Sequence, residues 1–357
     1  MKTTMKAVVA HAPYDYRYED VPVPQIAAGE MLLKVLACGV CAGDIKSYHG
    51  GIRIWGTSSD DRYIDAPVVG GHEICGEVVE LAPGVTGFSV GDRVVCEQIV
   101  PCGECHFCRT GTYWMCTRSA VYGFKEVCPG GFAEYVKTPA TAVTHVVPAS
   151  LTVEQAALVE PIACGMHALE QARIGHSDVV VVSGLGGIGL AMLSIAAAQL
   201  PRLLIGVDIR PDRVERGTDF GADVVLNAGE CDVAEVVHKL SGGLGCDVFI
   251  EVAGAPQSVR QGLDALRNRG RFVQMGVFAD LVEADWNVIG DGKELTILGS
   301  HLSGLTYPAV LKGIESGRIR TEGLVTHQFP LSQWEDAFRI AQGQPGALKV
   351  LLVPDGE

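Results

Sequence analysis

Residues 179–200 read VVVVSGLGGIGLAMLSIAAAQL. The valines Val179–Val182 predict a buried strand, and the apolar run from about Ile188 predicts a buried helix. The whole stretch is long enough to cross a membrane, but it is interrupted by Gly184, Gly186, Gly187 and Gly189. A strand, a tight turn and a helix in this order are typical of the start of a parallel α/β sheet.

The same alternation continues beyond this stretch. Further strands are expected at Leu203–Val207, Val248–Val252 and Arg271–Met275, and helices at Leu190–Gln199, Val233–Leu240 and Ser258–Leu266. This order predicts a doubly wound parallel sheet.

On the N-terminal side, short β-branched runs are closely separated by glycine and proline, at Leu32–Leu36, Gly76–Leu81 and Arg93–Cys96. They predict a partly open β-barrel or small sheet domain. We expect a β-rich domain over 1–160, a parallel-sheet domain over 161–300, and a segment over 301–357 that returns to the first domain.

The glycine turn is a candidate dinucleotide site. In Gly184-x-Gly186-Gly187-Ile188-Gly189, the first glycine would allow the tight turn, the second would let the backbone approach a pyrophosphate, and the third would allow close helix packing. Asp208 ends the next expected strand, 19 residues beyond Gly189. A carboxylate there binds a ribose diol and repels a 2′-phosphate, which favours NAD over NADP. Arg210 and Arg213 could soften this preference, with Arg213 a further cofactor contact, or they could be a solvated pair.

Four cysteines form the sharpest metal motif. Cys102, Cys105 and Cys108 are spaced by two residues each, and Cys116 follows in the same glycine-containing loop. Four thiolates suit one tetrahedral zinc ion, which would have no open position and would staple a loop without a core. A disulfide pair and an iron-sulfur cluster are the alternatives.

A second candidate site is scattered along the chain. Cys41, the pair His72-Glu73, and Glu160 offer one thiolate, one imidazole and a carboxylate. Together they would leave a coordination position open for water or a substrate oxygen. Taken singly, Cys41 could be a small buried apolar residue, His72 an interior histidine with its hydrogen bonds satisfied, and Glu160 a carboxylate at a helix N-terminus.

Composition limits the partners. The 28 basic and 42 acidic residues give a formal net charge of -14, which would repel phosphate backbones and anionic lipids. We therefore expect neither nucleic acid nor membrane partners. Met1–Pro13 does not read as a signal peptide, and 12 cysteines without one suggest thiols or metal ligands. These features favour the cytoplasm.

Motifs that match one family run along nearly the whole chain: Gly39-Val40-Cys41 with Asp44, Gly71-His72-Glu73, the Cys102–Cys116 loop, Glu160-Pro161, the Gly184–Gly189 turn and Asp208. With them the chain resembles the zinc-containing medium-chain dehydrogenases, the superfamily of alcohol, sorbitol and threonine dehydrogenases. The resemblance implies a GroES-like catalytic domain closed by the C-terminal segment, a Rossmann domain between, and an active site in the cleft.

Carried over by residue, the resemblance makes Cys41 and His72 catalytic zinc ligands and Glu73 a ligand or an alternate one. Glu160 stands where alcohol dehydrogenases have a cysteine. A glutamate at this position resembles the polyol dehydrogenases of the superfamily. Tyr48 matches a position that lines the substrate pocket of sorbitol dehydrogenases, although ordinary packing is the alternative.

Two positions depart from the family pattern. Gly43 stands where relatives carry a serine or threonine proton relay, and Lys46 stands where many carry a relay histidine. Proton removal would then fall to water near Glu160 or to Lys46, and an unperturbed lysine, with a pKa of about 10.4, is a poor base. Residues Ile52–Asp65 resemble an added loop near the substrate entrance.

The resemblance implies a zinc enzyme that oxidises a secondary hydroxyl and passes a hydride to NAD. We expect a short polyol as substrate, four-carbon threitol or erythritol first. A threonine-dehydrogenase-like oxidation of an amino acid and a catalytically silent NAD-binding protein are the alternatives. We also expect a homo-oligomer, a tetramer or a dimer.

Overall fold

Residues 3–58 and 60–356 are described by the computed structural model. The chain forms two units. The β-rich unit consists of Met1–Glu160, Tyr307–Glu315 and Thr321–Glu357, and the parallel-sheet unit of Pro161–Thr306 and Ser316–Arg320. The C-terminal part of the chain thus belongs mainly to the same unit as the N-terminal part.

The β-rich unit is built on a sheet with the strand order β10-β6-β5-β3-β18-β17, and β9 also pairs with β3. A smaller sheet has the order β2-β1-β4. β18 comes from the end of the chain and runs antiparallel to β3, with Val350 opposite Val40. The bounds are β1 Thr4–Ala12, β2 Asp15–Pro22, β3 Met31–Val40, β4 Val68–Val69, β5 Glu73–Leu81, β6 Arg93–Cys96, β7 Ile99–Val100, β8 Ala120–Val121, β9 Tyr135–Thr138, β10 Thr144–Val146, β17 Val325–Pro330 and β18 Lys349–Val353.

The core of this unit fills because its strands are rich in β-branched and aliphatic residues. Leu33, Val78 and Phe132 are fully buried within it. Short helices pack against this sheet: α4 contacts β3 and β5, and α11 contacts β17 and β18. The helices are α1 Ala42–Tyr48, α2 Ile52–Trp55, α3 His106–Arg109, η1 Tyr113–Met115, α4 Val153–Ala157, α10 Tyr307–Glu315, η4 Leu331–Gln333 and α11 Trp334–Ala341.

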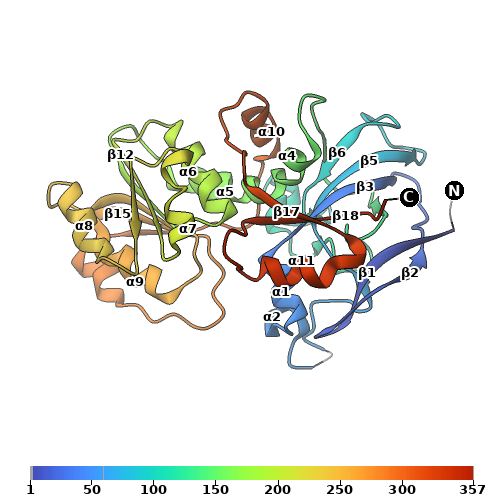
Figure 1. Cartoon of the computed structure of the whole chain (residues 1–357), viewed down its shortest axis with the longest axis horizontal. Coiled ribbons are helices and arrows are strands. Elements are labelled where there is room, and N and C mark those ends of the chain that lie inside the picture. Colours follow the sequence, from blue (N-terminus) through green and yellow to red (C-terminus); the bar gives the residue numbers. More distant parts are fainter. Residues whose placement is uncertain (1–2, 59, 357) are drawn as a thin grey trace. The chain divides into compact units, whose positions relative to one another are not determined.

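The parallel-sheet unit has the strand order β13-β12-β11-β14-β15-β16, and all its pairs are parallel. Its helices cover both faces of the sheet (Figure 1). Val179 and Val181 of β11 pack with residues of α8 and α9, whereas Gly206 of β12 faces Leu193 of α6. The elements are α5 Val159–Ala172, β11 Val179–Ser183, α6 Gly187–Ala197, β12 Leu203–Asp208, α7 Pro211–Val214, η2 Thr218–Phe220, β13 Val224–Asn227, α8 Val233–Leu240, β14 Cys246–Glu251, α9 Pro256–Ala265, β15 Leu266–Gln274, η3 Val288–Gly292 and β16 Thr296–Gly299.

The predicted fold class is confirmed: the chain contains a β-rich part and a doubly wound parallel sheet. Helix α8 has the predicted bounds, because the Asp232 side chain accepts a hydrogen bond from the Glu235 N–H and fixes its start. The main difference is that β15 begins at Leu266 rather than Arg271, directly after α9 ends at Ala265.

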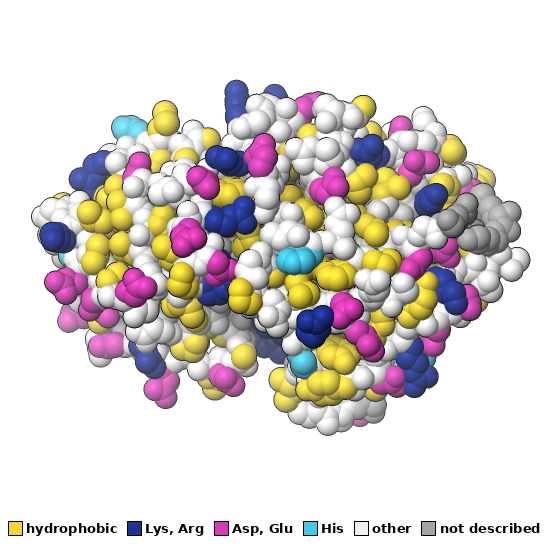
Figure 2. Space-filling view, in the orientation of Figure 1, with side chains coloured by type: hydrophobic (Ala, Val, Ile, Leu, Met, Phe, Trp, Pro, Cys, Tyr) yellow, Lys and Arg dark blue, Asp and Glu magenta, His cyan; other side chains and the backbone are white. Residues whose placement is uncertain are grey.

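The apolar stretch at 179–200 is divided between β11 and α6. Among residues 3–58 and 60–356, no helix combines the length and the apolar character that crossing a bilayer requires. On the face shown in Figure 2, acidic side chains are scattered with basic ones between them. This distribution fits the negative net charge and shows no extended basic area on that face.

Candidate metal centres and cofactor site

The four cysteines of the predicted zinc loop lie together. The Sγ atom of Cys105 lies 3.5 Å from that of Cys108 and 3.7 Å from that of Cys116, and the Sγ atoms of Cys102 and Cys108 are 3.9 Å apart. Zinc–sulfur bonds of about 2.3 Å in a tetrahedron place the sulfurs about 3.8 Å apart. The four thiols therefore fit one tetrahedral zinc ion, and all 12 cysteines of the chain are free thiols.

The backbone around this loop favours thiolates. The N–H groups of Cys102, Cys105 and Arg118 each donate to a cysteine sulfur at 3.4 Å. A backbone hydrogen bond from Cys108 is the main cause that lowers the pKa of the Cys105 thiol to about 6, whereas desolvation raises the pKa of the Cys108 thiol to about 12. The loop is also tied to the sheet, because the Tyr113 hydroxyl donates to both oxygens of buried Glu97 at 2.8 Å.

The second predicted site also comes together in part. Ligand atoms of Cys41, His72 and Glu73 all lie within 4.8 Å of one another. Cys41 follows strand β3 and is the N-cap residue of α1. Glu73 is the first residue of β5, the strand that pairs with β3 in the sheet. Gly71 makes the bend before His72, since its φ is +91° and a Cβ there would lie 2.5 Å from the Phe132 ring. One thiolate, one imidazole and one carboxylate in a buried cluster suit an open zinc site.

Asp44 fixes the first two of these residues. One of its oxygens accepts the Cys41 N–H at 2.9 Å, and the other lies 3.5 Å from Nδ1 of His72. Burial lowers the pKa of His72, but the charges of Asp44 and Cys41 outweigh it and raise the pKa well above its usual value. The groups around His72 thus favour a positive charge at this position. A carboxylate on the far nitrogen of a histidine also leaves the other nitrogen to the metal.

Glu73 has a second partner. Both of its carboxylate oxygens accept from Lys349 Nζ at 2.6 Å, and the same ammonium lies 3.3 Å from the Val40 carbonyl. Glu73 is 1% exposed and Lys349 is 8% exposed. Burial lowers the pKa of Lys349, but Glu73 outweighs this effect and the pKa is raised. Lys349 therefore keeps its positive charge beside Glu73.

Glu160 lies in the first turn of α5 and is buried. Among the described residues, it is not part of the group formed by Cys41, His72 and Glu73. Its charge contributes to the raised pKa of Lys349, so the two residues interact electrostatically. Glu160 remains a predicted ligand or proton-transfer group, and its helix-terminal position fits the structural alternative as well.

The residues predicted to line the site differ in their surroundings. The Tyr48 ring packs edge-on against Tyr16, Trp334 and Phe338, with ring centroids 5.4 to 5.8 Å apart, which favours the packing interpretation. Lys46 is exposed on α1. A Cβ on Gly43 would lie 3.7 Å from the His72 ring and 3.8 Å from the Cys41 sulfur, so the missing relay hydroxyl leaves free space beside both. Within the predicted loop Ile52–Asp65, position 59 lies outside the described residues.

The glycine turn has the geometry of a phosphate cradle. Gly184 has a φ of +107°, and a Cβ there would lie 2.6 Å from the Ala253 nitrogen. A Cβ on Gly189 would lie 1.8 Å from the Gly184 carbonyl oxygen, so only glycine allows α6 to start so close to the turn. Gly186 is the N-cap of α6, and a Cβ there would lie 3.9 Å from Nη1 of Arg213, which is an ordinary contact distance. The N–H groups at Gly187 and Ile188 then begin a helix whose N-terminus favours phosphate.

Asp208 ends β12 beside this turn. Its oxygens accept the Leu185 N–H at 2.7 Å and the Arg210 N–H at 2.9 Å. A carboxylate has about four acceptor sites, so it can still accept from a ribose diol. Arg213 Nη1 lies 3.6 Å from Asp208, whereas Arg210 is paired with Asp212 at 2.7 Å. Of the two arginines, Arg213 is the one directed at the candidate cofactor site.

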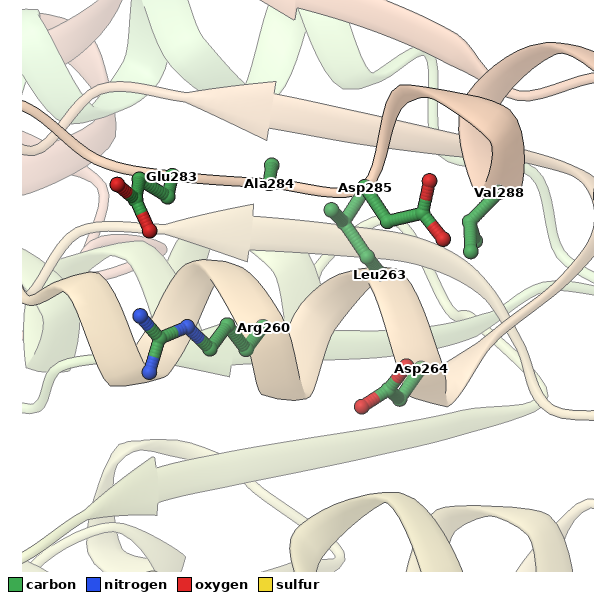
Figure 3. Close-up of a pocket in the computed structure, with 7 residues that line it drawn as sticks. All are labelled: Arg260, Leu263, Asp264, Glu283, Ala284, Asp285 and Val288. Atoms are coloured by element: carbon green, nitrogen blue, oxygen red, sulfur yellow. The ribbon is translucent and has the colours of Figure 1, made fainter.

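A separate pocket of about 420 Å³ lies in the parallel-sheet unit. Figure 3 shows Arg260, Leu263 and Asp264 on one helix, facing the segment with Glu283 and Asp285. The residues that line it include none of the predicted zinc or NAD residues. Its position is therefore distinct from the candidate sites above.

Two residues of the site were not assigned a role from the sequence. Asp44 was visible only as part of a family motif, although its position three residues after Cys41 is typical of an N-terminal cap that binds back to the chain. Lys349 is 276 positions from Glu73 and had no signal of its own.

The chain is similar to known dehydrogenases over most of its length. The model of the alcohol dehydrogenase GroES-like domain matches residues 27–149, and that of the zinc-binding dehydrogenase matches residues 187–316. An erythritol/L-threitol dehydrogenase of Mycolicibacterium smegmatis is 44% identical over 98% of each chain. The chain belongs to the zinc-binding dehydrogenase family. A sorbitol dehydrogenase of Halalkalibacterium halodurans is 34% identical over 98% of this chain and 99% of its own.

Among solved structures, a zinc-binding dehydrogenase of Sinorhizobium meliloti bound to NADP has a TM-score of 0.89 and 27% identity, over 99% of this chain and 100% of its own. A dehydrogenase of Escherichia coli complexed with NADH has a TM-score of 0.87 and 28% identity with the same coverage. This member of the family is an NAD-dependent oxidoreductase with zinc as its metal. Zinc is thereby favoured over a disulfide or an iron-sulfur cluster in the cysteine loop, and the catalytically silent alternative is not supported.

Proposed function

We propose that this enzyme oxidises a secondary hydroxyl of a short polyol to a ketose, with NAD as hydride acceptor and a four-carbon polyol as first choice. The observation that carries the proposal is the 44% identity with an erythritol/L-threitol dehydrogenase over 98% of both chains. The group of Cys41, His72 and Glu73 supports it, because an open zinc site of this kind can take the oxygen of a hydroxyl substrate.

In this proposal Cys41 and His72 hold the catalytic zinc, with Glu160 or Glu73 as the carboxylate, and Cys102, Cys105, Cys108 and Cys116 hold the structural zinc. When bound, zinc lowers the pKa of a hydroxyl it contacts, and NAD accepts the hydride. Asp44 orients His72 through Nδ1. Water that occupies the space beside Gly43 takes the substrate proton, with Glu160 as its acceptor. Lys46, an exposed ammonium, is the weaker candidate for this step.

The turn from Gly184 to Gly189 binds the NAD pyrophosphate in this proposal, and Asp208 accepts hydrogen bonds from the adenosine ribose.

We expect Asp208→Ala to lower the ratio of kcat/KM with NAD to that with NADP by about tenfold or more, because a 2′-phosphate would then meet Arg213 without an opposing carboxylate. Initial rates with both cofactors measure the ratio. Asp212→Ala, which removes the carboxylate that Arg210 binds, is the matched control. An unchanged ratio in Asp208→Ala would contradict the assignment.

The substrate is tested with a panel of erythritol, L-threitol, xylitol, sorbitol and butan-2-ol with NAD. We expect kcat/KM for the best four-carbon polyol to exceed that for butan-2-ol by about a hundredfold or more, because a site built to bind hydroxyls is left with unpaired polar groups by an analogue that lacks them. Equal efficiency on butan-2-ol and on the polyols would overturn the polyol assignment.

Amino-acid oxidation is the second candidate function. An L-threonine 3-dehydrogenase of Pyrococcus horikoshii is 34% identical over 99% of this chain and 100% of its own. L-threonine therefore belongs in the same panel. A kcat/KM for threonine above that for every polyol would favour this second function.

A further inference from the structure

Three adjacent strands of the parallel sheet, β11, β14 and β15, end side by side. Their last residues Ser183, Glu251 and Gln274 lie opposite one another in the register. The strand order reverses between β11 and β14, because β12 lies on the other side of β11. In doubly wound sheets, dinucleotides bind outside the carboxyl ends of the strands at this point. The loops that follow these strands therefore border the candidate NAD site.

Glycine lets the backbones of these loops approach one another. A Cβ on Gly184 would lie 2.6 Å from the Ala253 nitrogen, and a Cβ on Gly276 would lie 2.4 Å from the Gly254 nitrogen. The loops after β11 and β14 are also joined by a hydrogen bond, because the Ala253 N–H donates to the Ser183 carbonyl at 3.0 Å. The segment after β14 thus contacts both the glycine turn and the loop after β15.

The Glu251 side chain lies inside this group of loops. It is 0% exposed, and its Oε1 accepts the Gly254 N–H at 2.8 Å. Its Oε2 lies beside Gly276, where a Cβ would be 2.3 Å away. The Glu251 carbonyl accepts the N–H groups of Met275 and Gly276 at 3.0 and 2.9 Å. One residue therefore holds the loops after β14 and β15 together.

The burial of Glu251 lowers stability. Within residues 3–58 and 60–356, its Oε2 has no hydrogen-bond partner, and a buried oxygen without one destabilises a fold. Burial outweighs the hydrogen bonds to the carboxyl and raises the pKa of Glu251, so the neutral form is favoured. An apolar side chain would avoid this destabilisation but could not accept the Gly254 N–H. The hydrogen bond to the loop is what the carboxyl contributes.

We propose that Glu251 is a positioning residue for the cofactor: through Gly254 it holds the segment 252–255 against the glycine turn that receives NAD. This inference rests on the proposed function, which assigns the turn from Gly184 to Gly189 to the NAD pyrophosphate. It deepens that function, because it makes the affinity for the cofactor depend on a fully buried side chain.

Glu251→Leu and Glu251→Gln test the inference by titration of the zinc-loaded enzyme with NADH, followed by fluorescence. Leucine has no acceptor, so the Gly254 N–H loses its partner and we expect the Kd of NADH to rise by about tenfold. The KM for NAD should rise similarly, whereas kcat should change by less than about twofold, because the zinc ligands are untouched. Glutamine is neutral and keeps the acceptor, so its Kd should stay within about twofold of the wild type.

Asp247→Ala is the matched control. Asp247 is on the same strand but near its amino end, where it accepts the Val179 N–H at 2.8 Å. This variant should lower the Tm and leave the Kd of NADH unchanged. Glu251→Asp withdraws the acceptor by one methylene and should raise the Kd by about threefold or more. It decides the question if Glu251→Leu does not fold.

A wild-type Kd in Glu251→Leu, or in Glu251→Asp where leucine prevents folding, would overturn the inference. An equal rise of the Kd in Asp247→Ala would also overturn it, since Glu251 would then only support the fold. So would a Kd for Glu251→Gln as high as that for Glu251→Leu, because the charge and not the hydrogen bond would then matter.

Gly186→Ala distinguishes these outcomes from a failure of the proposed function. Gly186 has a φ of -66°, and a Cβ there meets only Nη1 of Arg213, at 3.9 Å, so alanine fits the fold. The added methyl group would still keep a pyrophosphate from approaching the backbone, and we expect NADH binding to weaken. Wild-type affinity for NADH in Gly186→Ala would contradict the proposed cofactor site itself.

Discussion

Cys105→Ser is expected to remove one zinc ion per chain and to lower the Tm of the enzyme by about 10 °C. Serine replaces a thiolate whose sulfur lies 3.5 Å from Cys108 and 3.7 Å from Cys116, so the tetrahedron loses a corner. The loop is built from short elements, α3 and η1, with little core of its own. A loss of about 3 kcal/mol, similar to that of a native cross-link, corresponds to this Tm shift at about 2–4 °C per kcal/mol, the scale for a unit of about 150–250 residues such as the β-rich unit that holds the loop.

Zinc analysis and thermal unfolding of the purified variant measure these changes. Cys231→Ser is the matched control, because Cys231 is half-buried and belongs to neither of the two candidate metal groups. Activity should fall in Cys105→Ser only as far as stability does. A variant with two zinc ions and an unchanged Tm would show that the loop is not a metal staple.

His72→Ala is expected to lower kcat by about a thousandfold or more while the Tm changes little beyond the loss of one buried side chain. The imidazole is buried between Asp44, Cys41 and the Phe124 ring, and no other histidine belongs to the described group that could replace it. The structural zinc and NAD binding should be unaffected, because neither involves His72. If His72→Ala keeps the structural zinc and still binds NAD, its loss of activity comes from the missing zinc ligand and not from unfolding.

The sequence was sufficient where local signals determine the structure. The valine strand, the glycine turn and the following helix lie at β11 and α6, because a glycine with positive φ and close packing at Gly189 leave few alternatives. The cysteine loop was equally readable, since its four thiols are within 14 residues of one another. Their proximity in space follows from chain connectivity.

The remaining features depend on strand pairing between distant segments. Lys349 reaches Glu73 only because β18 and β5 flank the same strand, and no pattern in either segment indicates this pairing. Tyr48 was predicted to line a pocket or to pack in the core. Its ring contacts the aromatic side chains of α11, and its role in a substrate pocket stays a prediction. The role of Glu160 also stays a prediction, because its place in a first helical turn is compatible with metal binding and with helix stabilisation.

We propose that zinc held by Cys41 and His72 is required to oxidise a short polyol with NAD. The most direct measurement is NADH formation from L-threitol and erythritol by the wild type, His72→Ala and His11→Ala, with zinc counted in the same preparations. His11 lies in the β-rich unit, paired with Glu19, and serves as a control. We expect two zinc ions and turnover in the wild type and in His11→Ala. We expect one zinc ion and almost no turnover in His72→Ala. If His72→Ala held one zinc ion and still oxidised either polyol at the wild-type rate, the role proposed for the zinc at Cys41 and His72 would be wrong.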